Sequence, residues 1–157
     1  MWFEFASSVA HNNGDTDEDT CPQNAHLGGY RNNTFRSNAA IGMRVYPHWS
    51  PHEDACNPVN PLPQYFYGIV SYRNGGNGYF TKFHGDIHHV GHSLLENAGN
   101  DVEIVKYASV PYSANPTFLD CLFVGRINLA SNNMNLGKLA VMGPQREFFY
   151  MDNCIGC

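Results

Sequence analysis

The chain has 157 residues, of which 43% are hydrophobic and 15% are charged, and its formal net charge is -5. This length and composition support a single domain with a buried core. Nine Lys and Arg residues and a negative net charge are not typical of a protein that binds nucleic acid. No apolar run approaches the roughly 18 residues that a membrane-spanning helix needs, and we expect neither a signal peptide nor an anchor in this chain.

The chain is expected to open with a strand over Trp2 to Ser8, followed by a polar, acidic loop. Because the strand starts at the first residues and the sequence stops directly after a strand-like run, we expect a segment of a longer polypeptide. In the loop, residues 15–19 offer carboxylates at alternate positions, as calcium prefers, but they lack the Gly and the distal Glu of an EF-hand. A solvated acidic loop is therefore the favoured interpretation, and a calcium site is the alternative.

One motif then recurs three times: an Asn, three mostly small residues, a Gly or Asp, and an alternating run. Its corner positions are Asn38 and Gly42, Asn74 and Gly78, and Asn97 and Asp101. These residue types tolerate left-handed backbone angles, and the alternation is typical of a half-buried strand. The aligned asparagines lie 36 and 23 residues apart, and the shorter spacing is close to one turn of a coil of parallel strands.

Repeated corners and strands predict an all-β fold over residues 1–157, namely a parallel β-helix or solenoid. Loop insertions are expected at about 9–29 and 47–64, the second because five prolines fall within 47–63. Inward side chains would form an apolar column that includes Ile69, Leu94, Val102, Leu122 and Val124. The open strand edges at the two ends favour end-to-end self-association.

The five cysteines and one sequon favour an extracellular address. Cys21 and Cys56 fall in loop-like stretches where a disulfide would staple an insertion, whereas Cys121 lies in an apolar run and is expected to be a core thiol. Cys154 and Cys157 form a C-x-x-C, for which a disulfide to a neighbouring turn or to a segment outside the chain is favoured over a redox or zinc site. Asn32 begins a glycosylation sequon, which is used only in a secreted chain.

A histidine-rich run is the first candidate for a metal site. Its possible ligands are His84, Asp86, His88 and His92. In an unbent strand these positions share one face, and imidazoles with a carboxylate suit zinc. Because Gly85 and Gly91 interrupt the run, a solvated or hydrogen-bonded face is the favoured interpretation.

A second candidate lies in the proline-bounded loop, where His52, Glu53 and Asp54 are consecutive. A His beside two carboxylates can bind a cation or act in acid/base chemistry. The alternative, which we favour, is that these side chains bond the backbone of the loop and hold the insertion against the body. The chain is also rich in aromatic residues, and exposed rings on such a coil would suit stacking on sugars.

Several blocks resemble one known family in the same order: Trp2 to Phe5, Tyr30 to Asn38 with Gly42 and Met43, Ser50 to Ala55, Ile69 to Asn74, and Cys121 to Gly125. They are similar to the parallel β-helix region of proteins that carry a G8 domain and PbH1 repeats: fibrocystin and its paralogue, and the cell-surface and secreted hyaluronan-depolymerising proteins. The resemblance implies a right-handed β-helix in a large extracellular or cell-surface glycoprotein, with the cilium among the expected locations. The proposed catalytic residues of the hyaluronan-degrading members lie upstream, with the G8 domain, so no catalytic residue is assigned here.

We therefore expect a rigid structural or adhesive segment that contacts its parent chain and an extracellular protein or polysaccharide. No cofactor is required, and this segment is expected to lack enzymatic activity. Two alternatives remain open, namely the non-catalytic part of a hyaluronan-type polysaccharide-degrading enzyme and a building block of an extracellular filament. The acidic loop, Cys21 and Cys56 depart from the hyaluronan-degrading members of the family.

Overall fold

The computed structural model of the chain describes residues 2–4, 9–10, 16–17, 21–57, 59–105, 117–125, 141–142 and 150–156. In the described part of the chain, no helix is long and apolar enough to cross a bilayer. The regular elements are strands, apart from one short 3-10 helix, η1 (Pro22–Asn24).

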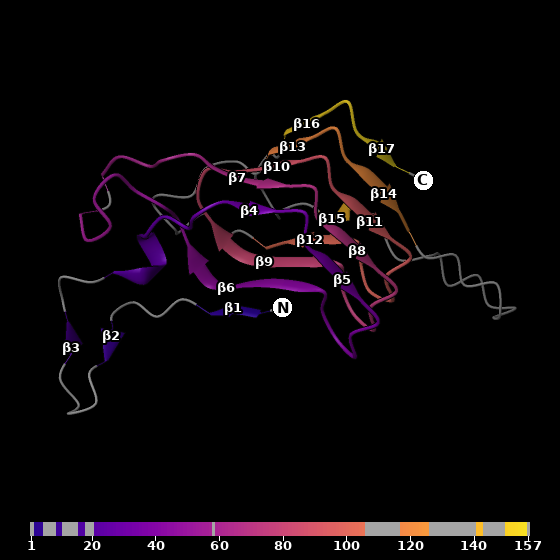
Figure 1. The fold of residues 1–157 in the computed structure, drawn as a ribbon, viewed down its shortest axis with the longest axis horizontal. Helices are drawn as coiled ribbons and strands as arrows, with labels where there is room; N and C mark the ends of the chain where they lie inside the picture. The colour runs from indigo at the N-terminus through magenta and orange to yellow at the C-terminus, as the bar shows by residue number, and fades with distance from the viewer. Residues whose placement is uncertain are drawn as a thin grey trace, which may run out of the picture.

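Three parallel sheets form the body of the molecule (Figure 1). Sheet 1 contains, in spatial order, β1 (Trp2–Glu4), β6 (Met43–Trp49), β9 (Tyr79–His84), β12 (Val102–Ile104) and β15 (Val141–Met142). Sheet 2 contains β16 (Tyr150–Asp152), β13 (Thr117–Leu119), β10 (Ile87–Val90), β7 (Gln64–Tyr67) and β4 (Tyr30–Arg31). Sheet 3 contains β17 (Ile155–Gly156), β14 (Leu122–Val124), β11 (Ser93–Leu95), β8 (Val70–Tyr72) and β5 (Thr34–Arg36).

The chain visits these sheets in turn. Strands β6, β7 and β8 belong to sheets 1, 2 and 3, and β9, β10 and β11 then return to the same three sheets in the same order. We call each such set of three consecutive strands a rung. All neighbouring strands within the three sheets pair in parallel. The prediction of an all-β fold with parallel strands is therefore confirmed.

The core lies between the sheets, where residues in register stack from rung to rung. Sheet 2 contributes Phe66, His89 and Phe118, and sheet 3 contributes Phe35, Leu94 and Phe123. The expected inward positions Ile69, Leu94 and Val102 are buried. Leu122 and Val124 were predicted on the wrong face, because the chain bends at Asp120 and the alternation in β14 buries Phe123 between them.

Left-handed backbone angles mark two corners of the rungs. One corner joins sheet 2 to sheet 3 and contains Asn32, Gly68, Gly91, Asp120 and Asn153, and the other follows sheet 3 at Ser37, Arg73 and Glu96. We expected such angles at the recurring Asn and at the Gly or Asp of the motif. That assignment was wrong, since the positive φ falls on the residue directly before each Asn, and the Gly or Asp four residues after each Asn has no positive φ.

The two insertions leave the body at one end of the rungs. The first contains β2 (Val9–Ala10), which pairs antiparallel with β3 (Thr16–Asp17), and then η1. Of the candidate calcium ligands in 15–19, the structure describes only the backbone of Thr16 and Asp17, and the other residues lie outside the described part of the chain. The second insertion begins later than predicted, because Pro47 is accommodated inside β6 by a shift of register between Val45 and His48. Its loop therefore runs over residues 50–63.

Candidate functional site

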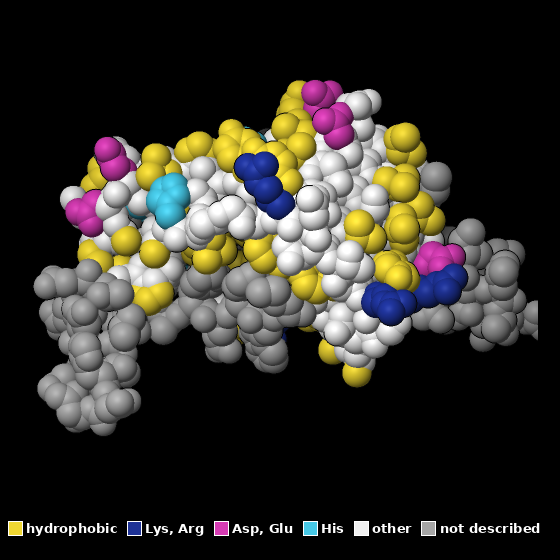
Figure 2. All heavy atoms as spheres, viewed as in Figure 1, with side chains coloured by type: hydrophobic (Ala, Val, Ile, Leu, Met, Phe, Trp, Pro, Cys, Tyr) yellow, Lys and Arg dark blue, Asp and Glu magenta, His cyan; other side chains and the backbone are white. Residues whose placement is uncertain are grey.

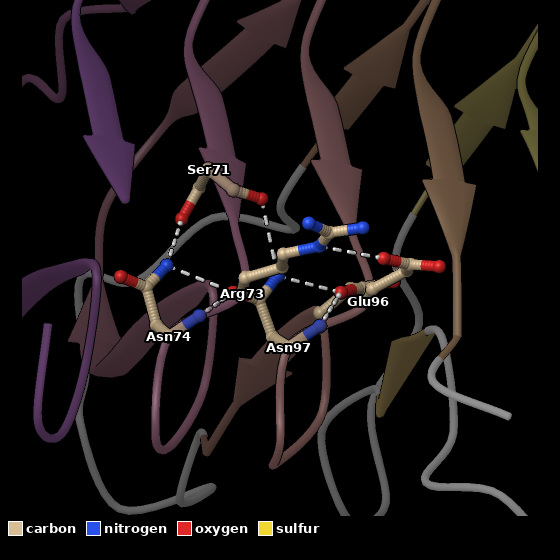
Figure 3. Close-up of polar contacts among 6 residues, drawn as sticks. Ser71, Arg73, Asn74, Glu96 and Asn97 are labelled. Carbon is tan, nitrogen blue, oxygen red and sulfur yellow. Dashed lines mark hydrogen bonds and ion pairs between the residues drawn. The ribbon is translucent and has the colours of Figure 1, made fainter. Parts of the chain in front are cut away.

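The recurring asparagines are joined by hydrogen bonds into a ladder from rung to rung, and Figure 3 shows the step between Asn74 and Asn97, which are both buried. The backbone N and the Nδ2 of Asn38 donate to Oδ1 of Asn74 at 3.1 and 2.7 Å. The same two groups of Asn74 donate to Oδ1 of Asn97 at 3.1 and 2.8 Å. The side-chain oxygen of Asn74, like that of Asn97, thus accepts hydrogen bonds from the asparagine of the preceding rung. The spacings of 36 and 23 residues each correspond to one step of the ladder.

Asp101 ends this ladder. Its Oδ1 accepts from the backbone N and the Nδ2 of Asn97 at 3.3 and 2.6 Å, which repeats the pattern of the asparagines. The side chain is only 1% exposed, and this burial raises its pKa from 3.8 to about 6, although the bonds from Asn97 oppose the shift. The positions of Gly42 and Gly78 have no space for a side chain. A Cβ at Gly78, for example, would lie 2.7 Å from the carbonyl oxygen of Asp101.

The histidine-rich run is divided between the surface and the core. His88 faces outward and pairs with Asp86 at 2.9 Å, whereas His92 is buried beyond the left-handed corner at Gly91. Only the backbone of His84 is described. The condition for a common face, an unbent strand, is not met, because the chain turns between β9 and β10 and again at Gly91. The described residues contain no group of three or more His, Cys, Asp or Glu suited to a metal.

A buried histidine pair, which no pattern in the sequence indicated, lies in the core instead. His89 stacks on Phe118 with ring centroids 4.5 Å apart, and its Nδ1 lies 3.2 Å from Nε2 of His92. Burial lowers the pKa of His92 to about 4, despite the contact of its Nδ1 with the carbonyl of Val90. The ring of His92 is therefore an uncharged member of the core at neutral pH.

The block His52, Glu53 and Asp54 diverges rather than converging on one point. His52 is buried with Nδ1 2.5 Å from the carbonyl oxygen of Ser50, whereas Glu53 and Asp54 are exposed. Glu53 accepts from Asn60, and Asp54 accepts from the backbone N of Cys56. These contacts lie within the loop, which favours the structural role over a cation or acid/base site.

The described cysteines comprise one disulfide pair and two free thiols, and the sequon begins at an exposed residue. Cys21 and Cys56 form a disulfide that joins the two insertions. Cys121 is a buried free thiol and Cys154 is a partly buried one, whereas Cys157 lies outside the described residues. Cys154 is not in a disulfide in this structure, where its Sγ accepts from the backbone N of Cys121, so the expected bond to a neighbouring turn or to a segment outside the chain stays a prediction. Asn32 is exposed at a corner.

An apolar strip covers the outer face of sheet 3 (Figure 2). Its hydrophobic side chains are Val70, Tyr72, Leu95, Leu122, Val124 and Ile155. A shallow groove of about 450 Å³ follows this face beside the exposed ion pair of Arg73 and Glu96, at 3.0 Å. The strip has few hydrogen-bonding groups, which distinguishes it from the outer face of sheet 2.

The outer face of sheet 2 presents aromatic rings with polar neighbours. Tyr65 is 43% exposed, and one side of its ring stacks on His88 in the next rung, with centroids 4.8 Å apart. Tyr67 lies beside it at 5.9 Å and is covered by the guanidinium of Arg31 at 4.5 Å. On the side of the preceding rung, β4 pairs with β7 so that Tyr30 lies opposite Phe66. Continued by one residue, this register sets Gly29 opposite Tyr65.

Because Gly29 has no side chain, it does not cover the partly exposed ring of Tyr65. A side chain added at Gly28 would meet no atom within 4 Å, and one at Gly29 would meet only Nε of Arg31 at 3.8 Å. Beside this open space, Nε2 of Gln64 donates to Nδ1 of His26. An aromatic ring flanked by a guanidinium, an amide and an imidazole can stack on an apolar ring face and hydrogen-bond the hydroxyls around it.

No family model, curated protein or solved structure matches this chain. Its function is therefore inferred from the arrangement of its own residues.

Proposed function

We propose that the chain is a segment of a right-handed parallel β-helix in an extracellular or cell-surface protein, and that it acts as a rigid scaffold that contacts glycans. The observation that carries the glycan contact is the ring of Tyr65, which is 43% exposed and lies opposite Gly29, a residue without a side chain, when the register of β4 and β7 is continued.

The scaffold role is supported by the order in which the chain visits its sheets. Each rung repeats the sheet order of the rung before it, and the asparagine ladder ties successive rungs along one edge. Parallel strands joined by crossovers within one sheet are right-handed in about 98% of cases, which supports the proposed handedness. Since inner strands bond on both sides, the stack resists bending.

The extracellular address is supported by the disulfide between Cys21 and Cys56 and by the exposed sequon at Asn32. Disulfides form and persist mainly in oxidising compartments. The resemblance to fibrocystin and the hyaluronan-depolymerising proteins points the same way. A ligand built of sugar rings fits Tyr65, because it offers an apolar ring face with hydroxyls around it.

The test is binding of the chain to immobilised hyaluronan, with a neutral glucan in parallel, measured by biolayer interferometry. We expect Tyr65→Ala to weaken polysaccharide binding by roughly fivefold, since one ring stack contributes about 1 kcal/mol. Gly29→Ile should block binding similarly by filling the open space beside the ring. Tyr72→Ala, on the apolar strip of sheet 3, is the matched control and should bind like the unchanged chain.

Circular dichroism verifies that each variant is folded. Absence of binding to either polymer, or equal binding by the Tyr65 and Tyr72 variants, contradicts the proposed contact. The enzymatic alternative is tested in the same samples, because shortening of hyaluronan during incubation would favour a polysaccharide-degrading protein over a scaffold.

A further inference from the structure

The free cysteines lie at equivalent positions of neighbouring rungs. Each occupies the corner between a sheet 2 strand and a sheet 3 strand: Cys121 between β13 and β14, and Cys154 between β16 and β17. The backbone N of Ile155 donates to the carbonyl oxygen of Cys121 at 2.8 Å, which makes the two corners direct neighbours in the ladder. Ile69 and His92 occupy the equivalent positions of the two preceding rungs.

This neighbourhood meets the backbone requirement for a disulfide. Neighbouring strands lie about 4.7 to 4.9 Å apart, and disulfides join Cα atoms that are about 4.4 to 6.8 Å apart. Sγ of Cys154 already points at the preceding rung, 3.4 Å from the backbone N of Cys121. Sγ of Cys121 contacts the carbonyls of Leu119 and His89 at 3.2 and 3.6 Å, and its thiol also interacts with the thiol of Cys154.

We propose that Cys121 and Cys154 form a second disulfide, which closes by rotation of the Cys121 side chain and ties the last described rung to the one before it. The inference rests on the proposed function only for the oxidising compartment. With glutathione disulfide as the oxidant, one thiolate attacks it and releases one glutathione thiolate. The second cysteine thiolate then attacks the mixed disulfide and releases the other glutathione. The two protons from the cysteines pass to the two glutathione thiolates, so two thiols are oxidised and one glutathione disulfide is reduced.

The order of attack follows from exposure. Cys154 is partly exposed and begins the exchange, whereas Cys121 is 2% exposed and burial raises its pKa to about 12. Its thiolate is therefore scarce in the folded chain, and bond formation is expected mainly during folding, before the corner is packed.

The test is a peptide map of the chain refolded with glutathione disulfide, alkylated under denaturing conditions without reductant, and digested with trypsin. Cleavage after Lys and Arg places Cys121 in peptide 107–126 and both Cys154 and Cys157 in peptide 147–157. The variant Cys157→Ser removes the second cysteine of that peptide. We expect the two peptides to be linked in this variant, and the link between peptides 1–31 and 45–73, which joins Cys21 to Cys56, serves as the internal control.

Thermal unfolding gives an independent readout. Removal of the bond between Cys121 and Cys154 by replacing either residue with Ser should lower Tm by roughly 5 to 10 °C relative to oxidised Cys157→Ser. Alkylation of both Cys121 and Cys154 in the oxidised sample, with the control peptides linked, would overturn the proposal. A bond between Cys154 and Cys157 in the unchanged chain would do so as well. Glycan binding at Tyr65 is unaffected by either result, so this proposal and the proposed function fail separately.

Discussion

Oδ1 of Asp101 accepts two hydrogen bonds from Asn97, one from the backbone N and one from Nδ2. An asparagine offers the same acceptor to the rung before it at Asn74 and Asn97. Asp101, four residues after Asn97 in the same corner, thus supplies Asn97 with the acceptor that an asparagine of the following rung supplies to Asn38 and Asn74. Because the carboxyl group of Asp101 carries a negative charge when ionised, its contribution to stability depends on pH.

We expect Asp101→Asn to stabilise the protein at pH 7. The pKa of Asp101 is raised from 3.8 to about 6, so its stabilising contribution is fully present below pH 3.8 and is lost as the pH rises to about 6. Asparagine keeps the acceptor and removes the buried charge, which should increase the free energy of unfolding at pH 7 by roughly 1 to 3 kcal/mol. Urea titrations at pH 7 and pH 4 measure this, and a gain that is no larger at pH 7 than at pH 4 contradicts the assignment.

The buried His92 should have the opposite pH dependence. Its pKa is lowered from 6.5 to about 4, so its contribution to stability is present above pH 6.5 and is lost as the pH falls to about 4. In the unchanged chain this loss is opposed by the gain from Asp101 in the same interval. Unfolding of Asp101→Asn followed from pH 7 to pH 4 should therefore show a steeper acid destabilisation than the unchanged chain. Equal slopes for the two proteins would argue against the raised pKa of Asp101, and an Asp101→Asn protein that loses no stability between pH 6.5 and pH 4 would argue against the lowered pKa of His92.

The central asparagine of the ladder should be important for folding. Asn74 is 1% exposed and bonds Asn38, Asn97 and Ser71 through its side chain. Replacement by Ala leaves buried donors and an acceptor without partners, and we expect a loss of about 2 to 4 kcal/mol. Asn33→Ala is the matched control, since that side chain makes one exposed bond to the carbonyl of Arg31. It should change the free energy of unfolding by less than about 1 kcal/mol in chemical denaturation.

Close packing at the motif glycines predicts a second pair of variants. A Cβ at Gly78 would lie 2.6 Å from Nδ2 of Asn97 and 2.7 Å from the carbonyl oxygen of Asp101. Because the second atom belongs to the backbone, Gly78→Ala must displace a neighbouring rung, at a cost of about 1 to 3 kcal/mol. Gly29→Ala adds the same methyl group in open space and should be close to neutral. Similar Tm values for the two variants would contradict this explanation of the glycine.

Part of the candidate site could be predicted because it is encoded in local pattern. The recurring Asn and the two spacings identified the residues of the ladder, and the loop context of Cys21 and Cys56 identified the disulfide. The open side of Tyr65 could not be predicted, since it depends on which residue of an earlier rung lies opposite the ring. That residue is Gly29, which directly precedes β4 and lies opposite Tyr65 when the register of β4 and β7 is continued, although the two are far apart in the sequence.

Short parallel strands joined at repeated polar corners are encoded locally in the sequence, because Asn and Gly favour corners and alternating apolar residues favour strands. Which side chains face inward beyond each corner depends instead on contacts between rungs. A single left-handed residue resets the alternation, and at Arg73, Glu96 and Asp120 no glycine marks it in advance. Such residues adopt that angle at a cost of about 1 kcal/mol each, which hydrogen bonds between neighbouring rungs offset once the rungs are stacked.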